Sequence, residues 1–304
     1  MSVEPPPVCD YEGSAYSTEF WGGDQRNYED QVERIAMRRL LPSGGQRVLE
    51  VGAGFGRLTD ELAGYREVVL HDYSRSMLQE ARARLGDGEG GHRYRYVASD
   101  VYRLPFAPGV FDGATMIRVI HHIADAPAAL AQVRAALAEG AIFILEYANK
   151  RNFKAIARYL LRKQSWNPFS PDPIEFIALN FNFHPKMMRQ TVQNAEFSIN
   201  RQLTVSHFRI ARLKQAVPTH ILVALERPIQ RTGAWWQFSP SVFMQLQATG
   251  TAPTPPTLPT SIFKCPACGC LEMHETAAAL DCPDCGRRYH IRDGIYDFKE
   301  PDLS

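Results

Sequence analysis

Five of the six cysteines in this 304-residue chain lie within the short stretch 265–285. The sequences CPACGC at 265–270 and CPDCG at 282–286 form two CxxC pairs with 13 residues between them. Each CxxC turn can aim two thiolates at one ion, and two such turns complete the tetrahedral site that Zn²⁺ prefers. Four protein ligands leave no open position, so the metal should be structural. We predict zinc ligation by Cys265, Cys268, Cys282 and Cys285, with Cys270 as a spare thiol.

A glycine-rich loop follows a short apolar segment in VLEVGAGFGRL at 48–58. Its glycines let the backbone approach a ligand closely, and the start of the next helix presents unpaired amides. Dinucleotide sites use GxGxxG, whereas the spacing here is GxGxG. Glu50 lies within the strand, where it would repel a pyrophosphate but attract an ammonium group.

Two further acids complete this pattern. Asp72 ends the second predicted strand, 20 residues after Gly52, where a carboxylate can bind ribose hydroxyls. Asp100 follows the third strand and could accept a hydrogen bond from an adenine amino group. Ribose, adenine and a cationic amino-acid tail together describe S-adenosylmethionine (SAM), so we predict a SAM pocket.

Methyl transfer from SAM is an in-line displacement, so positioning does most of the work and a base is needed only for a protonated nucleophile. The sequence lacks an Asn/Asp-Pro-Pro-aromatic tetrad and a CxxxCxxC motif, and the part before the zinc motif has only Cys9. These absences disfavour adenine amino methylation, radical chemistry and cytosine C5 methylation. Each candidate base has an alternative role in packing or capping; the candidates are His121, His122, Glu146 and His184.

The elements that must position these residues alternate between strands and helices. Strands separated by helical patterns of 10–15 residues predict a parallel sheet with helices on both faces, and a ligand crevice at the carboxyl ends of the first strands. The predicted strands are 46–51, 67–71, 93–98, 111–119, 141–147, 197–205 and 221–226, and the predicted helices are 58–63, 76–85, 127–137 and 152–163.

At this point the sequence resembles the class I (Rossmann-like) SAM-dependent methyltransferases, over about residues 16–226. The motifs that carry the resemblance are VLEVGAGFGRL, HDYSRSMLQEARARL, SDVYRLPF and FDGATMIRVIHHI, with EFWGGDQRNYED resembling the helix that covers SAM. The resemblance implies an α/β, doubly wound, mostly parallel seven-stranded sheet. It implies cofactor contacts from Glu50, Gly52, Ala53, Gly54, Gly56, Asp72, Tyr73, Met77, Asp100, Val101, Arg118, Val119 and Tyr28, and less directly Arg26.

The C-terminal sequence DCPDCGRRYHIRDGIYDF resembles the small zinc-ribbon proteins that act as activator subunits of RNA- and protein-methylating enzymes. In that family the ribbon pairs with the methyltransferase sheet or covers apolar surface. The resemblance implies an activator fused in cis, although a tethered ribbon could instead meet substrate.

Charge and composition divide the chain unevenly. The net charge is +1, yet residues 150–231 hold 14 Lys and Arg against four acids, a balance of +10 that leaves −9 for the rest. The helix within 152–163 is basic and amphipathic, which suits a solvated face or a lid toward an anionic acceptor. We predict a methyltransferase domain at 1–230 with a basic helical insertion or lid at 150–185, an aromatic extension at 231–247, a Pro-rich linker at 248–260 and a zinc ribbon at 261–304. The aromatic segment Trp235–Val242 should pack back on the domain.

These observations favour a SAM-dependent methyltransferase whose acceptor is a small molecule or lipid-like metabolite. RNA is the alternative acceptor, because of the ribbon and the basic segment, and a non-catalytic SAM-binding scaffold is the alternative of another class. The longest apolar runs have five residues and the N-terminus MSVEPPPVCDYEG lacks the pattern of a secretion signal. We therefore expect a cytoplasmic protein with no membrane span and no obligate protein partner.

Overall fold

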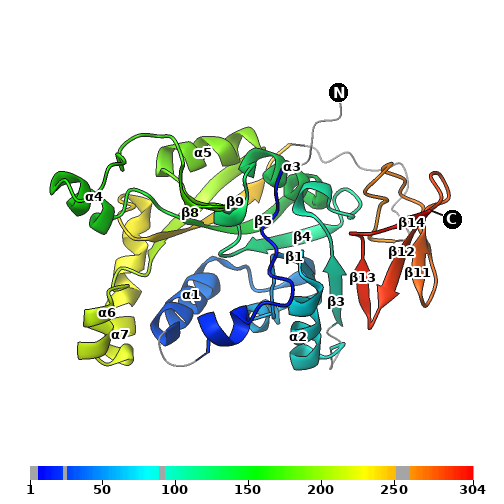
Figure 1. Ribbon diagram of the computed structural model, residues 1–304, viewed down its shortest axis with the longest axis horizontal. Coiled ribbons are helices and arrows are strands. Elements are labelled where there is room, and N and C mark those ends of the chain that lie inside the picture. Colours follow the sequence, from blue (N-terminus) through cyan, green and yellow to red (C-terminus); the bar gives the residue numbers. More distant parts are fainter. Residues whose placement is uncertain (1–5, 23–25, 89–92, 251–260, 304) are drawn as a thin grey trace.

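A twisted central sheet runs through the molecule (Figure 1). The computed structural model describes residues 6–22, 26–88, 93–250 and 261–303. Seven strands follow the order β3-β2-β1-β4-β5-β9-β8, all parallel except β9, which is antiparallel to both neighbours. This confirms the predicted fold class. The strands are β1 (Gly45–Val51), β2 (Tyr65–Asp72), β3 (Arg93–Ala98), β4 (Phe111–Met116), β5 (Leu137–Ala148), β8 (Phe197–Val205) and β9 (Ser241–Ala248).

Helices cover both faces of the sheet because successive strand residues point to opposite sides. In β9, Val242, Met244 and Leu246 belong to one buried cluster, whereas Phe243 belongs to the other. The first cluster packs under α3 (Ala126–Ala136) and α5 (Pro185–Asn194), and the second under α1 (Asn27–Leu40), α2 (Arg75–Leu85) and α7 (Thr219–Ile229). Figure 1 shows these two helical layers above and below the sheet.

Two sequence predictions about local structure are wrong. Residues 221–226 form the middle of α7 and not a strand, because Leu222, Val223 and Glu226 are buried on one side of a helix that packs against α1. Such a short apolar run does not distinguish helix from strand. The strand that completes the sheet is β9, in the segment predicted as an aromatic extension and linker start. The predicted helix 58–63 is only a short 3₁₀ segment, η3 (Thr59–Leu62).

The aromatic segment before β9 packs only in part. Phe238 stacks on Phe153 with ring centroids 5.0 Å apart, as expected of a segment that folds back on the domain. Trp235 and Trp236 are instead 77% and 66% exposed, so the packing prediction is wrong for both. Residues 251–260, most of the predicted linker, lie outside the described residues, as do residues 23–25 of the predicted cofactor-covering segment.

The C-terminal unit, residues 261–303, joins the sheet directly and is called the ribbon below. Its strand β13 (Ile295–Asp297) pairs in parallel with β3 and so extends the sheet at the β3 edge (Figure 1). Phe263 and Phe298 enter the same buried cluster as Phe106 of the main domain. The remaining ribbon strands are β10 (His274–Glu275), β11 (Ala279–Asp281), β12 (Arg287–Arg292) and β14 (Asp302–Leu303).

Between β5 and α5 the chain forms a separate excursion. It comprises α4 (Phe153–Leu160) and a two-stranded hairpin of β6 (Ile174–Ile177) and β7 (Asn180–Asn182). Short elements complete the list: α6 (Ala211–Ala216), η1 (Tyr16–Phe20), η4 (Val101–Arg103), η5 (Ile120–His122) and η6 (Gln230–Ala234). Among the described residues, the helices are too short or too polar for any of them to cross a bilayer.

Candidate functional site

The glycine loop after β1 is folded as a backbone cradle. Gly52 has φ +67°, and a Cβ there would lie 2.2 Å from the Val119 side chain, so only glycine fits. Gly54 has φ +55° with open space in front of it, and its amide donates to Asp72 Oδ2 at 2.7 Å. The other oxygen of Asp72 accepts from the Ser74 amide at 2.9 Å. The loop and the end of β2 are therefore locked together by one carboxylate.

Glu50 lies at the carboxyl end of β1 and is buried, with 7% of its surface exposed. The Thr59 hydroxyl donates to Glu50 Oε2 at 2.6 Å. Burial raises the pKa of Glu50 to about 7 despite that hydrogen bond. A cation that entered beside Glu50 would stabilise the ionised carboxylate.

A cavity opens at the carboxyl ends of β1, β2 and β4, as predicted for this fold. It encloses about 1060 Å³ of empty space, including the part open to solvent. Eleven of the predicted site residues line it: Glu50, Gly52, Ala53, Gly54, Asp72, Tyr73, Met77, Val101, Arg118, Val119 and His122.

The N-terminal segment forms part of the cavity wall, a role that the sequence did not predict. Val8 forms an antiparallel bridge with Ile123, and Cys9 and Tyr11 line the wall. Glu12 then anchors the segment by accepting from two amides at the start of α2, Arg75 at 2.7 Å and Ser76 at 3.0 Å. Trp21, within the predicted covering segment, also lines the cavity. No motif signals residues 8–12; their role follows from contacts far away in the sequence.

Arg118 lies just beyond the end of β4 in a conformation rare for its type, with φ +61°. Its amide donates to Glu146 Oε2 at 2.9 Å, and its Nε donates to Glu33 Oε1 at 2.7 Å. The Trp21 ring lies 5.2 Å from its guanidinium. A strained backbone persists only when its surroundings over-determine it, and such positions cluster at functional sites. Glu146 thus holds the backbone of a cavity residue and does not itself line the cavity.

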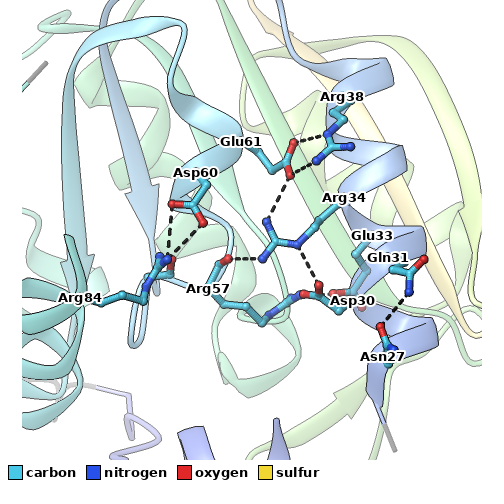
Figure 2. A network of polar contacts seen from close by, with 11 residues as sticks. Asn27, Asp30, Gln31, Glu33, Arg34, Arg38, Arg57, Asp60, Glu61 and Arg84 are labelled. Atoms are coloured by element: carbon cyan, nitrogen blue, oxygen red, sulfur yellow. Dashed lines mark hydrogen bonds and ion pairs between the residues drawn. The ribbon is translucent and has the colours of Figure 1, made fainter. Parts of the chain in front are cut away.

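Arg57 is held against the cavity by acids of α1. Its guanidinium donates to Asp30 at 2.5 Å and to Glu33 at 2.6 Å, and the Trp21 ring lies 3.7 Å from it. Burial alone would raise the pKa of Glu33, but Arg118 and Arg57 hold it below its usual range. Figure 2 shows how Arg34 extends the network from Asp30 to the Arg57 carbonyl and to Glu61.

His122 is oriented by two contacts at the cavity wall. Its Nδ1 lies 3.0 Å from the Leu179 carbonyl of the β6–β7 hairpin, so this nitrogen carries the proton. In the neutral ring Nε2 is then an acceptor, and it lies 3.2 Å from the Tyr11 hydroxyl. Burial lowers the pKa of His122, which favours the neutral form. The ring is thus prepared to accept a proton at Nε2.

The other predicted site residues lie outside this cavity. The Tyr28 hydroxyl donates to Glu226 of α7 at 2.7 Å in the buried packing of α1. His184 caps α5 by accepting from the Lys186 amide at 3.1 Å. Burial lowers the pKa of His121, whose ring packs against His122. Asp100 accepts from the Tyr102 amide at 2.9 Å and lines a neighbouring hollow at the ribbon, shared with Tyr73. Gly56 and Glu146, also predicted as site residues, do not line the cavity either.

The four predicted zinc ligands converge in the ribbon. The ligand atoms of Cys265, Cys268, Cys282 and Cys285 all lie within 4.8 Å of one another. Two of the sulfur pairs are 3.5 and 3.6 Å apart, close to the spacing of about 3.8 Å for thiolates bound tetrahedrally at about 2.3 Å. Gly269 and Gly286 have φ of +83° and +68°, as the two CxxC turns require. The donor set therefore fits Zn²⁺, and Cys270 stays outside it.

Comparison with known proteins identifies the same region. The family model "Methyltransferase domain" matches residues 48–140. The O-methyltransferase cnsE of Penicillium expansum is 31% identical over 118 residues, which cover 38% of this chain and 43% of that relative. The ubiquinone/menaquinone biosynthesis C-methyltransferase UbiE of Paracoccus denitrificans is 36% identical over 113 residues, covering 36% and 45%. The chain thus spans less than half the length of these relatives.

A solved structure extends the likeness of fold beyond that region. It is the complex between the Haloferax volcanii Trm112 methyltransferase activator and a methyltransferase. The match covers 79% of this chain and 97% of that chain, with a TM-score of 0.52 and 16% identity. At this identity the likeness concerns the fold alone.

Proposed function

We propose that this chain, whose residues 48–140 match the family model "Methyltransferase domain", is a class I SAM-dependent methyltransferase that moves a methyl group from SAM to a small apolar or lipid-like acceptor. The observation that carries the proposal is the single cavity that unites Gly52, Gly54, Glu50 and Asp72. Relatives with partial coverage include both O- and C-methyltransferases, which supports methyl transfer but leaves the acceptor atom open.

Each wall of the cavity offers the chemistry that one part of SAM needs. Asp72 would accept from the ribose hydroxyls, and Tyr73 and Met77 would flank the adenine. Glu50 would face the ammonium group, while Arg57 and Arg118 supply positive charge for the carboxylate. The cofactor contributes an electrophilic methyl carbon on a positively charged sulfur. The N-terminal segment, which lines one wall, would shield part of this site from water.

His122 is the residue we assign to the acceptor. Its Nε2 faces the Tyr11 hydroxyl, and an acceptor hydroxyl in that place would donate to Nε2 in the same way. Nε2 then takes the proton as the acceptor oxygen becomes methylated, while Nδ1 stays bonded to Leu179. A carbon or nitrogen acceptor with no proton to lose would use His122 only for positioning.

The ribbon would act as a structural activator within the same chain. Its four cysteines would hold one Zn²⁺, whose binding free energy becomes folding free energy for a unit of this size. Lys299 donates to the Tyr73 carbonyl at 2.9 Å, and its Nζ lies 4.0 Å from the Tyr73 ring centroid. The ribbon therefore supports one of the residues assigned to adenine.

The direct test is calorimetry with SAM and S-adenosylhomocysteine. Asp72→Ala removes the carboxylate that holds both Gly54 and the ribose, so we expect binding to weaken by about 100-fold. Arg66→Glu, at an exposed position of β2, is the matched control and should bind as the unaltered chain does. If the unaltered chain binds neither compound, the proposal is wrong.

A further inference from the structure

Exposed large apolar side chains are concentrated in one part of the chain. Of the twelve most prominent among the described residues, eleven lie between positions 153 and 236, and the twelfth is Leu303. The same part of the chain carries the +10 charge balance. Contiguous exposed apolar surface on a soluble fold marks an interaction site. Here the apolar and the basic residues coincide.

Two large apolar residues of helix α4 face solvent. Ala155 is the buried residue of this helix, whereas Phe153 and Leu160, seven positions apart on one face, are 66% and 69% exposed. The helix is nevertheless held firmly in place. Asn152 caps it by accepting from the Ala155 amide at 3.0 Å, and the Phe153 amide donates to the Phe238 carbonyl at 2.9 Å. Its exposure is therefore built into the fold.

The surroundings of α4 add interfacial side chains. Leu161, directly after the helix, is 65% exposed. Trp235 and Trp236 lie just before Phe238, which stacks on Phe153. In Figure 1, α4 projects from the end of the molecule opposite the ribbon. Tryptophan is favoured where one end of a side chain is apolar and the other wet, as at a membrane interface.

Positive charge accompanies this apolar surface. The side chains of Lys154, Arg158, Arg162 and Lys163 are all exposed. The acids within 150–185 are Asp172 and Glu175, and both already accept hydrogen bonds, from the Ser170 hydroxyl at 2.6 Å and the Leu179 amide at 2.7 Å. These hydrogen bonds leave both carboxylates charged, so an anionic surface would meet four cations beside α4 against two acids of this segment.

We propose that α4, Leu161–Lys163 and Trp235–Trp236 form a docking surface for an anionic lipid bilayer. The apolar side chains would enter the boundary between headgroups and acyl chains while the cations meet the phosphates. RNA would use the cations and the tryptophans but leave Leu160 and Leu161 without a role. A second copy of this surface would bring like charges together. Of these three partners, the bilayer is the one that would contact both the apolar and the basic side chains of this surface.

The β6–β7 hairpin belongs to the same excursion of the chain as α4 and contacts the candidate active site. Ile177 of this hairpin is 64% exposed, and two residues later the Leu179 carbonyl accepts from His122. A bilayer that met Ile177 as well as α4 would lie next to the hairpin whose turn orients a cavity residue. That an apolar acceptor is taken from the bilayer rests on the proposed function, whereas docking itself does not.

Vesicle sedimentation of the full chain tests the docking. Vesicles of phosphatidylcholine with about one third phosphatidylglycerol should bind the protein, and pure phosphatidylcholine should bind it at least about tenfold more weakly. Leu160→Ser with Leu161→Ser should reduce binding about tenfold, whereas Leu303→Ser, equally apolar and 77% exposed, should not change it. Arg158→Glu with Arg162→Glu should reduce binding at least tenfold and Arg66→Glu should leave it unchanged.

Two outcomes would overturn the docking surface. One is no binding of the unaltered chain to the anionic vesicles at low salt, whether it binds RNA or self-associates instead. The other is binding that Leu160→Ser with Leu161→Ser leaves intact. SAM calorimetry on the same samples separates the two proposals. Retained SAM binding without vesicle binding defeats only the docking, and vesicle binding without SAM binding defeats only the methyltransferase.

Discussion

The two ends of this molecule treat their apolar residues in opposite ways. At the ribbon end, Phe263 and Phe298 are 0% and 5% exposed, because the small unit shares a core with the main domain. At the α4 end, Phe153 and Leu160 are 66% and 69% exposed although the helix is capped and fixed. At the ribbon end the chain buries its own apolar side chains, whereas at the α4 end they stay exposed and a partner could cover them. The candidate active site lies between them.

The largest expected effect concerns the proposed zinc site of the ribbon. Cys282→Ser removes one of four converging thiolates, so we expect loss of one zinc ion per chain and a large fall in melting temperature. Cys270→Ser is the matched control, since Cys270 lies outside the cluster. Elemental analysis and thermal unfolding measure both quantities. Unchanged zinc content and stability in Cys282→Ser would contradict a structural site.

The same substitution at the two ends should have unequal effects on stability. Phe263→Ala leaves a cavity where the ring stacks on Phe106, with centroids 6.1 Å apart, and should cost about 3–5 kcal/mol. Phe153→Ala should cost less than about 1 kcal/mol, because the ring is mostly in solvent already. Denaturant unfolding of the full chain measures both. Equal losses would remove the distinction between a closed and an open end.

The pH dependence of binding should distinguish the buried cavity from the exposed surface. Burial raises the pKa of Glu50 to about 7, and only the ionised form attracts an ammonium group. SAM affinity should therefore fall as pH drops below about 7, by up to about tenfold per unit, with proton release on binding. Vesicle binding should stay constant from about pH 6 to 8, because lysine and arginine in water keep their charge there.

Glu50→Gln supplies the control for this comparison. The amide cannot ionise, so SAM affinity should be lower at pH 8 and no longer depend on pH near 7. Vesicle binding of the variant should equal that of the unaltered chain. A SAM affinity that changes equally with pH in both proteins would show that another group titrates.

Much of the cavity could be predicted because its residues follow strand ends at short spacings. Gly52, Gly54, Glu50 and Asp72 all belong to two adjacent strands and the loop between them, and the parallel order brings them together. The convergence of the four cysteines could be predicted for the same reason, since each CxxC turn is local. Local sequence dictates both sites.

What sequence patterns could not reveal depends on distant contacts. Tyr11 meets His122 across 111 residues, and no motif marks the N-terminal segment that carries it. Tyr28 is an aromatic residue at a position where it could cover the cofactor. Its hydroxyl instead donates to Glu226, which lies in a helix that the sequence predicted as a strand. His184 has the chemistry of a base and serves as a cap. The residue types were compatible with several roles, and tertiary packing chose among them.

Transfer of labelled methyl groups from SAM into a fractionated cell extract tests the central claim most directly. The account predicts label in the solvent-extractable fraction that contains lipids and apolar metabolites, and loss of that label with Asp72→Ala but not with Arg66→Glu. Label in RNA or protein, or no label in any fraction from a chain that carries its zinc, would contradict it.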